Sequence, residues 1–444
     1  KNKVEKVANS GSEPRHLTEV DGKLYYSATS GKGREPWVVK DGQAAQLQDI
    51  NPGIRSSNPK QFQLARRETK KGTQKFLYFS ANGGERGIEL WTQNISKGGE
   101  KAERLADIYS GAPSSDPRHL TNSNERLYFT ANDGETGREL WTIDAPSGGD
   151  ACGANSPDDC DTDITDPSRA NLVESSLVKN IRTKSKSSDP TELHNHRGGL
   201  IFSANNGRNG HEPWISQGTT ESTTLFLDIN NGERSSSPSS FTSYKSSLFF
   251  AADNGRRGSE LWVSNGQESG TELAADIQPG EGSSSPSDLV VQGKTLYMAA
   301  DDGLRGRELW SYDTKSGRSA LVRDIRSGSR TGSNPSDLTS LNGAIIFAAE
   351  GDAYGRELWS SDGTKSGTKF LVDINPGGLN SNPADFPLLD SNLYFTASTY
   401  FNGRQILKLD GSGFNVTEMI ESSGQANATE PSDLYASREQ LFFS

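Results

Sequence analysis

Residues 335–377 read PSDLTSLNGAIIFAAEGDAYGRELWSSDGTKSGTKFLVDINPG, one complete copy of a unit that recurs through the 444-residue chain. Three of its runs are rich in β-branched or aromatic residues: Ile345-Ile346-Phe347, Glu357-Leu358-Trp359 and Phe370-Leu371-Val372. Gly, Asp, Asn, Pro and Ser bound these runs, which is the pattern of short β-strands. A fourth, less distinct strand is expected at P-x-x-L. We name the four strands a (P-x-x-L), b (the apolar triplet), c (E-L-W) and d (before D-I).

The seven tryptophans mark the repeats, because each is the last residue of the pattern G-x-E-[L/P]-W. They are Trp37, Trp91, Trp141, Trp214, Trp262, Trp310 and Trp359. Gly403 to Leu407 is a degenerate eighth copy. Most copies are about 48 residues apart, the size of a propeller blade. The b triplet recurs nine times and the c strand eight times. We therefore predict a single all-β domain over residues 1–444, a β-propeller of eight or nine four-stranded blades with almost no helix.

The ends of the chain bear on how such an array closes. Val4 to Ala8 resembles a d strand, and the sequence stops inside a ninth unit. A last blade completed by both termini would remove exposed sheet edges. The alternative is that the chain is a piece of a longer array.

Structural roles are expected for the repeated residues. The tryptophans should anchor adjoining sheets. The glutamates before them, including Glu308 and Glu357, should accept N–H groups of the glycine loop between strands b and c, or pair with a basic side chain. The alternative is a functional ring of carboxylates. The glycines of that loop, such as Gly303 and Gly306, should adopt positive φ.

An insertion at residues 142–178 explains the longest interval between tryptophans. It contains both cysteines of the chain, Cys152 and Cys160, in a polar stretch. A local disulfide is expected and would place the protein in an oxidising compartment; two free surface thiols are the alternative. Asp161 and Asp163 belong to an acidic run that is a candidate for calcium, the cation that prefers oxygen ligands.

A variable position precedes the leucine of P-x-x-L. It is occupied in turn by His16, Gln61, His119, Glu192, Ser240, Asp288, Asp337, Asp385 and Asp433. If strand a is innermost, the four aspartates converge and could bind calcium, the one cofactor that we consider. Turn capping by short side chains is the alternative reading.

Composition and motifs exclude several classes of protein. The net charge is −11 with basic and acidic residues interspersed, so no nucleic-acid partner is expected. No apolar run is long enough for a membrane span. The five histidines form no H-E-x-x-H site, and neither a G-x-S-x-G motif nor a phosphate loop is present, so we do not predict an enzyme.

The stretch Glu357 to Thr364 reads E-L-W-S-S-D-G-T and matches the signature of a known repeat. Gly367-Thr368 and Leu371 to Gly377 continue the match. The chain resembles the ELWxxDGT repeat (hyalin-like repeat) proteins over nearly its whole length outside 142–178. The resemblance implies a secreted or surface protein built of many repeats, with no catalytic residues assigned to the motif.

These observations predict an extracellular or cell-surface protein that acts as a structural or adhesive module. Its variable blade loops would contact other extracellular or surface proteins, and glycans are further candidate partners. A lectin-like, carbohydrate-binding propeller is the second interpretation. A polysaccharide hydrolase that uses the axial carboxylates is the third.

Overall fold

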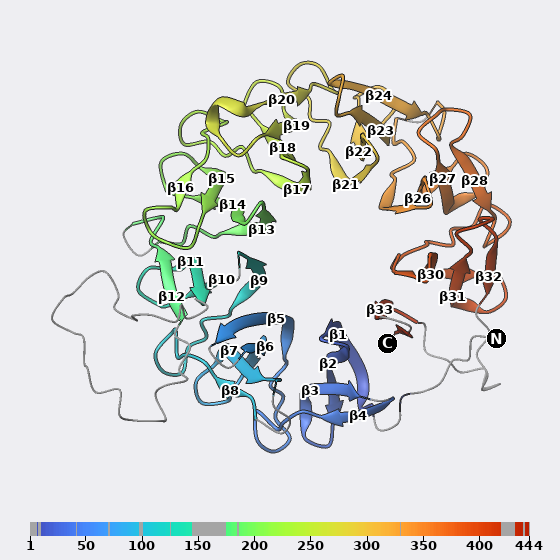
Figure 1. Ribbon diagram of the computed structural model, residues 1–444. Helices are drawn as coiled ribbons and strands as arrows, with labels where there is room; N and C mark the ends of the chain where they lie inside the picture. Colours follow the sequence, from blue (N-terminus) through green and yellow to red (C-terminus); the bar gives the residue numbers. More distant parts are fainter. Residues whose placement is uncertain are drawn as a thin grey trace. The chain divides into compact units, whose positions relative to one another are not determined.

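The structure is a computed structural model, and it describes residues 7, 10–40, 42–69, 72–96, 101–124, 126–143, 175–183, 186–328, 330–418, 431–437 and 440–443. The chain is an all-β protein of the β-propeller class, as the repeats predict. Eight four-stranded antiparallel sheets follow one another along the sequence, and within each the strands are ordered as in the chain (Figure 1). The chain divides into two compact units. One contains Val7–Arg208 and Pro213–Leu225, and the other contains Asn209–Glu212 and Phe226–Ser444.

Blades 1 to 4 occupy the first half of the chain. Blade 1 consists of β1 (Ser12–Val20), β2 (Lys23–Ser30), β3 (Gly33–Lys40) and β4 (Gln43–Gln46). Blade 2 consists of β5 (Lys60–Thr69), β6 (Gly72–Asn82), β7 (Ile88–Asn94) and β8 (Glu103–Arg104). Blade 3 consists of β9 (Arg118–Ser123), β10 (Arg126–Asn132), β11 (Arg138–Ile143) and β12 (Ser175–Lys179). Blade 4 consists of β13 (Thr191–His196), β14 (Gly199–Asn205), β15 (His211–Ser216) and β16 (Thr224–Leu225).

Blades 5 to 8 follow. Blade 5 consists of β17 (Ser239–Tyr244), β18 (Ser247–Asp253), β19 (Ser259–Ser264) and β20 (Thr271–Ala275). Blade 6 consists of β21 (Ser287–Gln292), β22 (Thr295–Asp301), β23 (Arg307–Asp313) and β24 (Arg318–Arg323). Blade 7 consists of β25 (Ser336–Leu341), β26 (Ala344–Gly351), β27 (Gly355–Ser361) and β28 (Lys369–Val372). Blade 8 consists of β29 (Leu388–Leu389), β30 (Asn392–Thr399), β31 (Gly403–Leu409) and β32 (Val416–Glu418).

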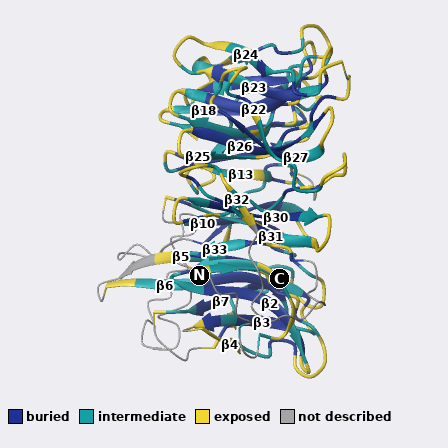
Figure 2. Ribbon diagram, turned by 90° about the vertical axis from the view of Figure 1, so that its right-hand side faces the viewer, coloured by how far each residue is buried: buried dark blue, intermediate teal, exposed yellow. Residues whose placement is uncertain are grey.

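The hydrophobic core is divided among the spaces between successive sheets. In the b strand of blade 7, Ile345 and Phe347 pack with Tyr297 of blade 6, whereas Ile346 packs with Leu393 of blade 8. Side chains alternate between the two faces of a strand, so one apolar triplet contributes to two cores. Figure 2 shows the central strands in dark blue and many of the connecting loops in yellow. Blade 7 is thereby buried on both faces by its neighbours in the same unit.

The ninth apolar triplet does not build a complete blade. It forms a two-stranded sheet of β33 (Tyr435–Ser437) and β34 (Gln440–Phe442), whose neighbour Leu434 packs with Tyr394 and Ile406 of blade 8. The segment from Val4 to Ala8, expected to supply a d strand, lies outside the described residues except for Val7.

The insertion is shorter than the predicted range 142–178. Thr142 and Ile143 continue β11, and Ser175 to Val178 belong to β12. Residues 144–174, including Cys152, Cys160, Asp161 and Asp163, lie outside the described residues. Elsewhere, the one helical element that the described part contains is the 3-10 turn Glu268–Gly270. Among the same residues, no helix is both long and apolar enough to cross a membrane.

Candidate functional sites

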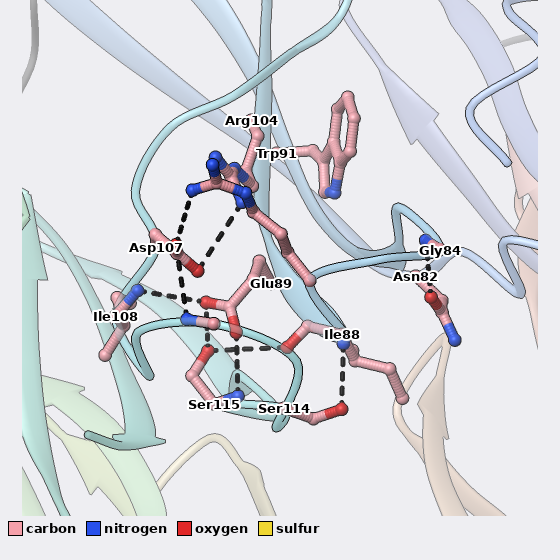
Figure 3. Close-up of polar contacts among 12 residues, drawn as sticks. Asn82, Gly84, Ile88, Glu89, Trp91, Arg104, Asp107, Ile108, Ser114 and Ser115 are labelled. Carbon is pink, nitrogen blue, oxygen red and sulfur yellow. Dashed lines mark hydrogen bonds and ion pairs between the residues drawn. The ribbon is translucent and has the colours of Figure 1, made fainter. Parts of the chain in front are cut away.

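Each of the first seven blades contains a glutamate with a fully buried side chain, and Glu89 of blade 2 illustrates its contacts (Figure 3). One carboxylate oxygen of Glu89 accepts the backbone N–H of Ser115 at 2.9 Å. The other accepts the Ser115 hydroxyl at 2.6 Å and the backbone N–H of Ile108 at 3.2 Å. Ser115 lies in the linker to blade 3, and its carbonyl accepts the N–H of Asn132 in β10. We call this arrangement the glutamate–serine joint.

The joint recurs in both units with the same donors. Its glutamate, isoleucine and serine are Glu35, Ile50 and Ser57; Glu89, Ile108 and Ser115; Glu139, Ile181 and Ser188; Glu212, Ile229 and Ser236; Glu260, Ile277 and Ser284; Glu308, Ile325 and Ser333; Glu357, Ile374 and Ser381. In each case the serine carbonyl also accepts an N–H from a following b strand. A buried carboxylate is tolerated because its oxygens are occupied by donors.

The predicted partners of these glutamates were wrong. The donors come from the segment after strand d and from the linker beyond it, and not from the glycine loop. The arginine next to the glutamate does not pair with it either: Arg356, for example, donates to the carbonyl of Asn334, the residue before Pro335. The missed signal is a serine two residues before the proline of P-x-x-L, as in Ser333-Asn334-Pro335. It is present in eight units, and the serines of seven of them form the joint.

Burial changes the acidity of the joint. Desolvation raises the pKa of Glu139, Glu212 and Glu357 to about 7, and the hydrogen bonds from serine and isoleucine oppose that rise. The pKa values of the other four glutamates are raised for the same reason. Glu139, Glu212 and Glu357 are therefore sensitive to pH near neutrality. None of the seven glutamates has an exposed surface on which a substrate could bind.

The tryptophans pack at the blade interfaces. Trp37, Trp214, Trp262 and Trp359 are buried, and Trp91, Trp141 and Trp310 are half-buried. In four blades the indole N–H donates to an alanine carbonyl of the neighbouring b strand, as from Trp262 to Ala252 at 3.0 Å. Gly303 and Gly306 have φ of 75° and 74°, as predicted for the loop between strands b and c.

The variable position of strand a has an unexpected conformation. All nine residues, from His16 to Asp433, have φ between 53° and 58°, a region that favours glycine. In blade 7 the register shifts between Ser336 and Thr339, so Asp337 lies in a β-bulge. Its neighbour in blade 6, Asp288, accepts the backbone N–H of Asp337 at 3.2 Å. The residue at the variable position therefore changes the direction of strand a, and its side chain can contact the next blade.

The four aspartates proposed as cation ligands are not all brought together by the contacts that the structure shows. Asp288 contacts the backbone of Asp337, whereas Asp385 accepts the Thr396 hydroxyl within its own blade at 2.9 Å. Asp433 is exposed beside β33. Among the described residues, no group of three or more His, Cys, Asp and Glu side chains is arranged to hold a metal ion. Calcium binding stays a prediction.

A second carboxylate recurs beside the joint, at the aspartate of D-I. A side chain of the loop between strands b and c reaches its Oδ2 in five blades: Lys32 to Asp49 at 3.6 Å, Arg86 to Asp107 at 2.7 Å, Asn209 to Asp228 at 2.7 Å, Arg257 to Asp276 at 2.5 Å and Arg305 to Asp324 at 3.8 Å. Blade 3 has the uncharged pair Thr136 and Asn180 at these positions. The loop thus supplies a donor to the aspartate in five blades, and the donor is positively charged in four of them.

Large exposed hydrophobic side chains gather in one part of the sequence. Of the seven in the described residues, six lie between Leu304 and Phe401: Leu304, Tyr354, Leu379, Leu388, Tyr400 and Phe401, with Ile54 the seventh. Leu304, Tyr354 and the Tyr400-Phe401 pair occupy the same loop, between strands b and c, in blades 6, 7 and 8. Phe401 is 88% exposed. Because three successive blades expose apolar side chains on the same loop, these loops are the candidate interaction surface.

No family model and no curated protein matches the chain. Among solved structures, the computationally designed Ika8 protein matches 90% of this chain and 97% of its own, at 13% identity and a TM-score of 0.44. A puromycin hydrolase matches 98% of this chain at 13% identity and a TM-score of 0.44, and the match spans 58% of the hydrolase. The β-propeller domain of the Trilobed protease from Pyrococcus furiosus matches 82% of this chain and 99% of its own, at 11% identity and a TM-score of 0.38. At such low identity, the activities of these proteins are not carried over to this chain.

Proposed function

We propose that this β-propeller is a non-catalytic, extracellular interaction module that presents its variable blade loops to protein or matrix partners. The row of exposed hydrophobic side chains in the loops between strands b and c of blades 6 to 8 carries the proposal. The repeated glutamates are committed to the joints, whereas Tyr400 and Phe401 face solvent at the tip of a hairpin. The ELWxxDGT resemblance supports the extracellular location.

The test compares partner capture by loop variants. The immobilised chain is incubated with surface and matrix proteins of its source, and bound proteins are quantified by mass spectrometry. Replacing both Tyr400 and Phe401 by serine should reduce capture of the specific partner at least tenfold. The matched control is Ile54→Ser, which removes a side chain that is 86% exposed in the other unit. Equal capture by the double variant and the wild type would refute the proposal.

Carbohydrate binding is the second candidate, because the same loop offers two aromatic rings. The rings of Tyr400 and Phe401 lie 4.9 Å apart at an interplanar angle of 86°, so one ring can contact the face of a sugar while the other borders it. A glycan array separates the two candidates. Binding of one glycan class that the double serine variant loses would favour the lectin-like function.

A further inference from the structure

Blade 7 differs from the other blades with a D-I aspartate, because its loop supplies no donor to that aspartate among the contacts of the described residues. Its aspartate is Asp373, and the loop residue that corresponds to Arg305 of blade 6 is Tyr354. The two loops have the same length, so tyrosine replaces arginine without a gap. No hydrogen bond or ion pair from the described part of the chain reaches the Asp373 carboxylate. Its Oδ1 is buried without a hydrogen-bond partner, as it is in the five blades that have a loop donor, so blade 7 differs from them at Oδ2.

The nearby Arg356 is used elsewhere. It donates to Asn334 and to the hydroxyl of Ser336. Leaving a half-buried carboxylate without a counter-charge costs stability. The other blades with an aspartate here show that the fold can supply a donor to Oδ2 from the loop. Blade 7 has lost that donor and kept the acid.

The substituted tyrosine builds an aromatic surface at the loop position from which the other blades reach their aspartate. The Tyr354 ring stacks on Phe370 with centroids 4.3 Å apart and an interplanar angle of 16°, and Phe370 meets Trp359 edge-on at 5.8 Å. Tyr354 remains 42% exposed. Phe370 lies opposite Trp359 in strand d, where blades 3 to 6 have leucine. The blade thus combines an unpaired carboxylate with an aromatic ring that is open to solvent.

We propose that blade 7 binds an arginine side chain of a partner polypeptide, which takes the place of the absent loop arginine. The guanidinium would pair with Oδ2 of Asp373 and lie against the exposed part of Tyr354. Arginine fits better than lysine because its planar group can stack on an aromatic ring and still donate to a carboxylate. This inference rests on the proposed function, since it names the chemistry by which one blade recognises its partner.

The experiment measures binding of the peptide acetyl-Gly-Arg-Gly-amide to the full chain by saturation-transfer NMR. Wild type should bind the peptide weakly but measurably. Asp373→Asn should weaken binding at least tenfold, because the counter-charge is lost. Tyr354→Arg should also weaken it at least tenfold and raise the melting temperature, since the blade then fills its own site. Tyr354→Ala should weaken binding by about two- to fivefold, the share expected from stacking.

Asp324→Asn is the matched control, because Asp324 of blade 6 already has Arg305 beside it; this variant should bind the peptide as wild type does. The proposal is overturned if wild type fails to bind, if Asp373→Asn binds as well as wild type, or if the Asp324 variant loses binding equally. The same assay is run with acetyl-Gly-Lys-Gly-amide, glucosamine and calcium. Tighter binding of any of these than of the arginine peptide would overturn the assignment to arginine. The peptide assay does not involve Tyr400 or Phe401, so its failure is distinct from failure of partner capture.

Discussion

Replacing Glu308 by glutamine tests whether the glutamate–serine joint stabilises the fold. One Glu308 oxygen accepts Ser333 N–H at 2.9 Å, and the other accepts the Ser333 hydroxyl at 2.6 Å and Ile325 N–H at 3.2 Å. The amide NH2 of glutamine must face one of these sets of donors. Leaving one or two buried donors unsatisfied costs roughly 1–3 kcal/mol each, so we expect the free energy of unfolding to fall by about 3 kcal/mol.

Ser333→Ala removes the hydroxyl bond to the carboxylate and should cost roughly 1.5–3 kcal/mol. Because both substitutions break the same bond, the double variant should be less destabilised than the sum by about 1 kcal/mol or more. Urea unfolding at pH 8, followed by tryptophan fluorescence, measures each value. Glu281→Gln, at an exposed position, is the control and should change nothing. A Glu308→Gln variant as stable as wild type, or strict additivity, would refute the role assigned to the joint.

Three further predictions concern pH, the aromatic anchors and the glycine loop. Burial raises the pKa of Glu357 from 4.5 to about 7, so the stability it contributes is full below pH 4.5 and is lost as pH rises through 7. The urea midpoint of wild type should therefore lie above that of Glu357→Gln throughout, by a gap that narrows between pH 5 and pH 8, and a constant gap would contradict this. Trp359→Ala should cost about 3–5 kcal/mol by emptying a buried site, and an unchanged melting temperature would show that the ring is dispensable. Gly306→Ala should destabilise more than Gly293→Ala in thermal melts, because both have positive φ but only the Gly306 Cβ would collide with backbone, at the carbonyl of Arg330; equal losses would exclude that collision.

The sequence was sufficient for the strands because their signals are local. The triplet Ile345 to Phe347 and the E-L-W run fall in strands b and c as predicted, and Gly303 has the positive φ that its loop requires. The number of four-stranded blades equals the number of c strands, which is eight, and not the number of apolar triplets, which is nine. A triplet such as the one ending at Phe443 can pair in a two-stranded sheet without a c strand.

The contacts of the candidate sites were harder to predict because they join residues far apart in the chain. Glu308 binds Ser333 of the following linker, and a repeated serine before proline carries that signal only once its partner is known. The positive φ of His16 or Gln61 has no local signal, since neither residue type demands it. The unpaired state of Asp373 emerged from comparing loops that the fold makes equivalent.

The glutamate–serine joint also bears on how such a chain grows during evolution. The glutamate comes from one copy of the unit, and the serine lies in the segment that leads to the next. Tandem duplication of one unit of about 48 residues would therefore create one new, fully bonded junction and leave every older one intact. Copy number can drift by unequal recombination without exposing a buried carboxylate, while the loops of each new copy are free to diverge toward a different ligand.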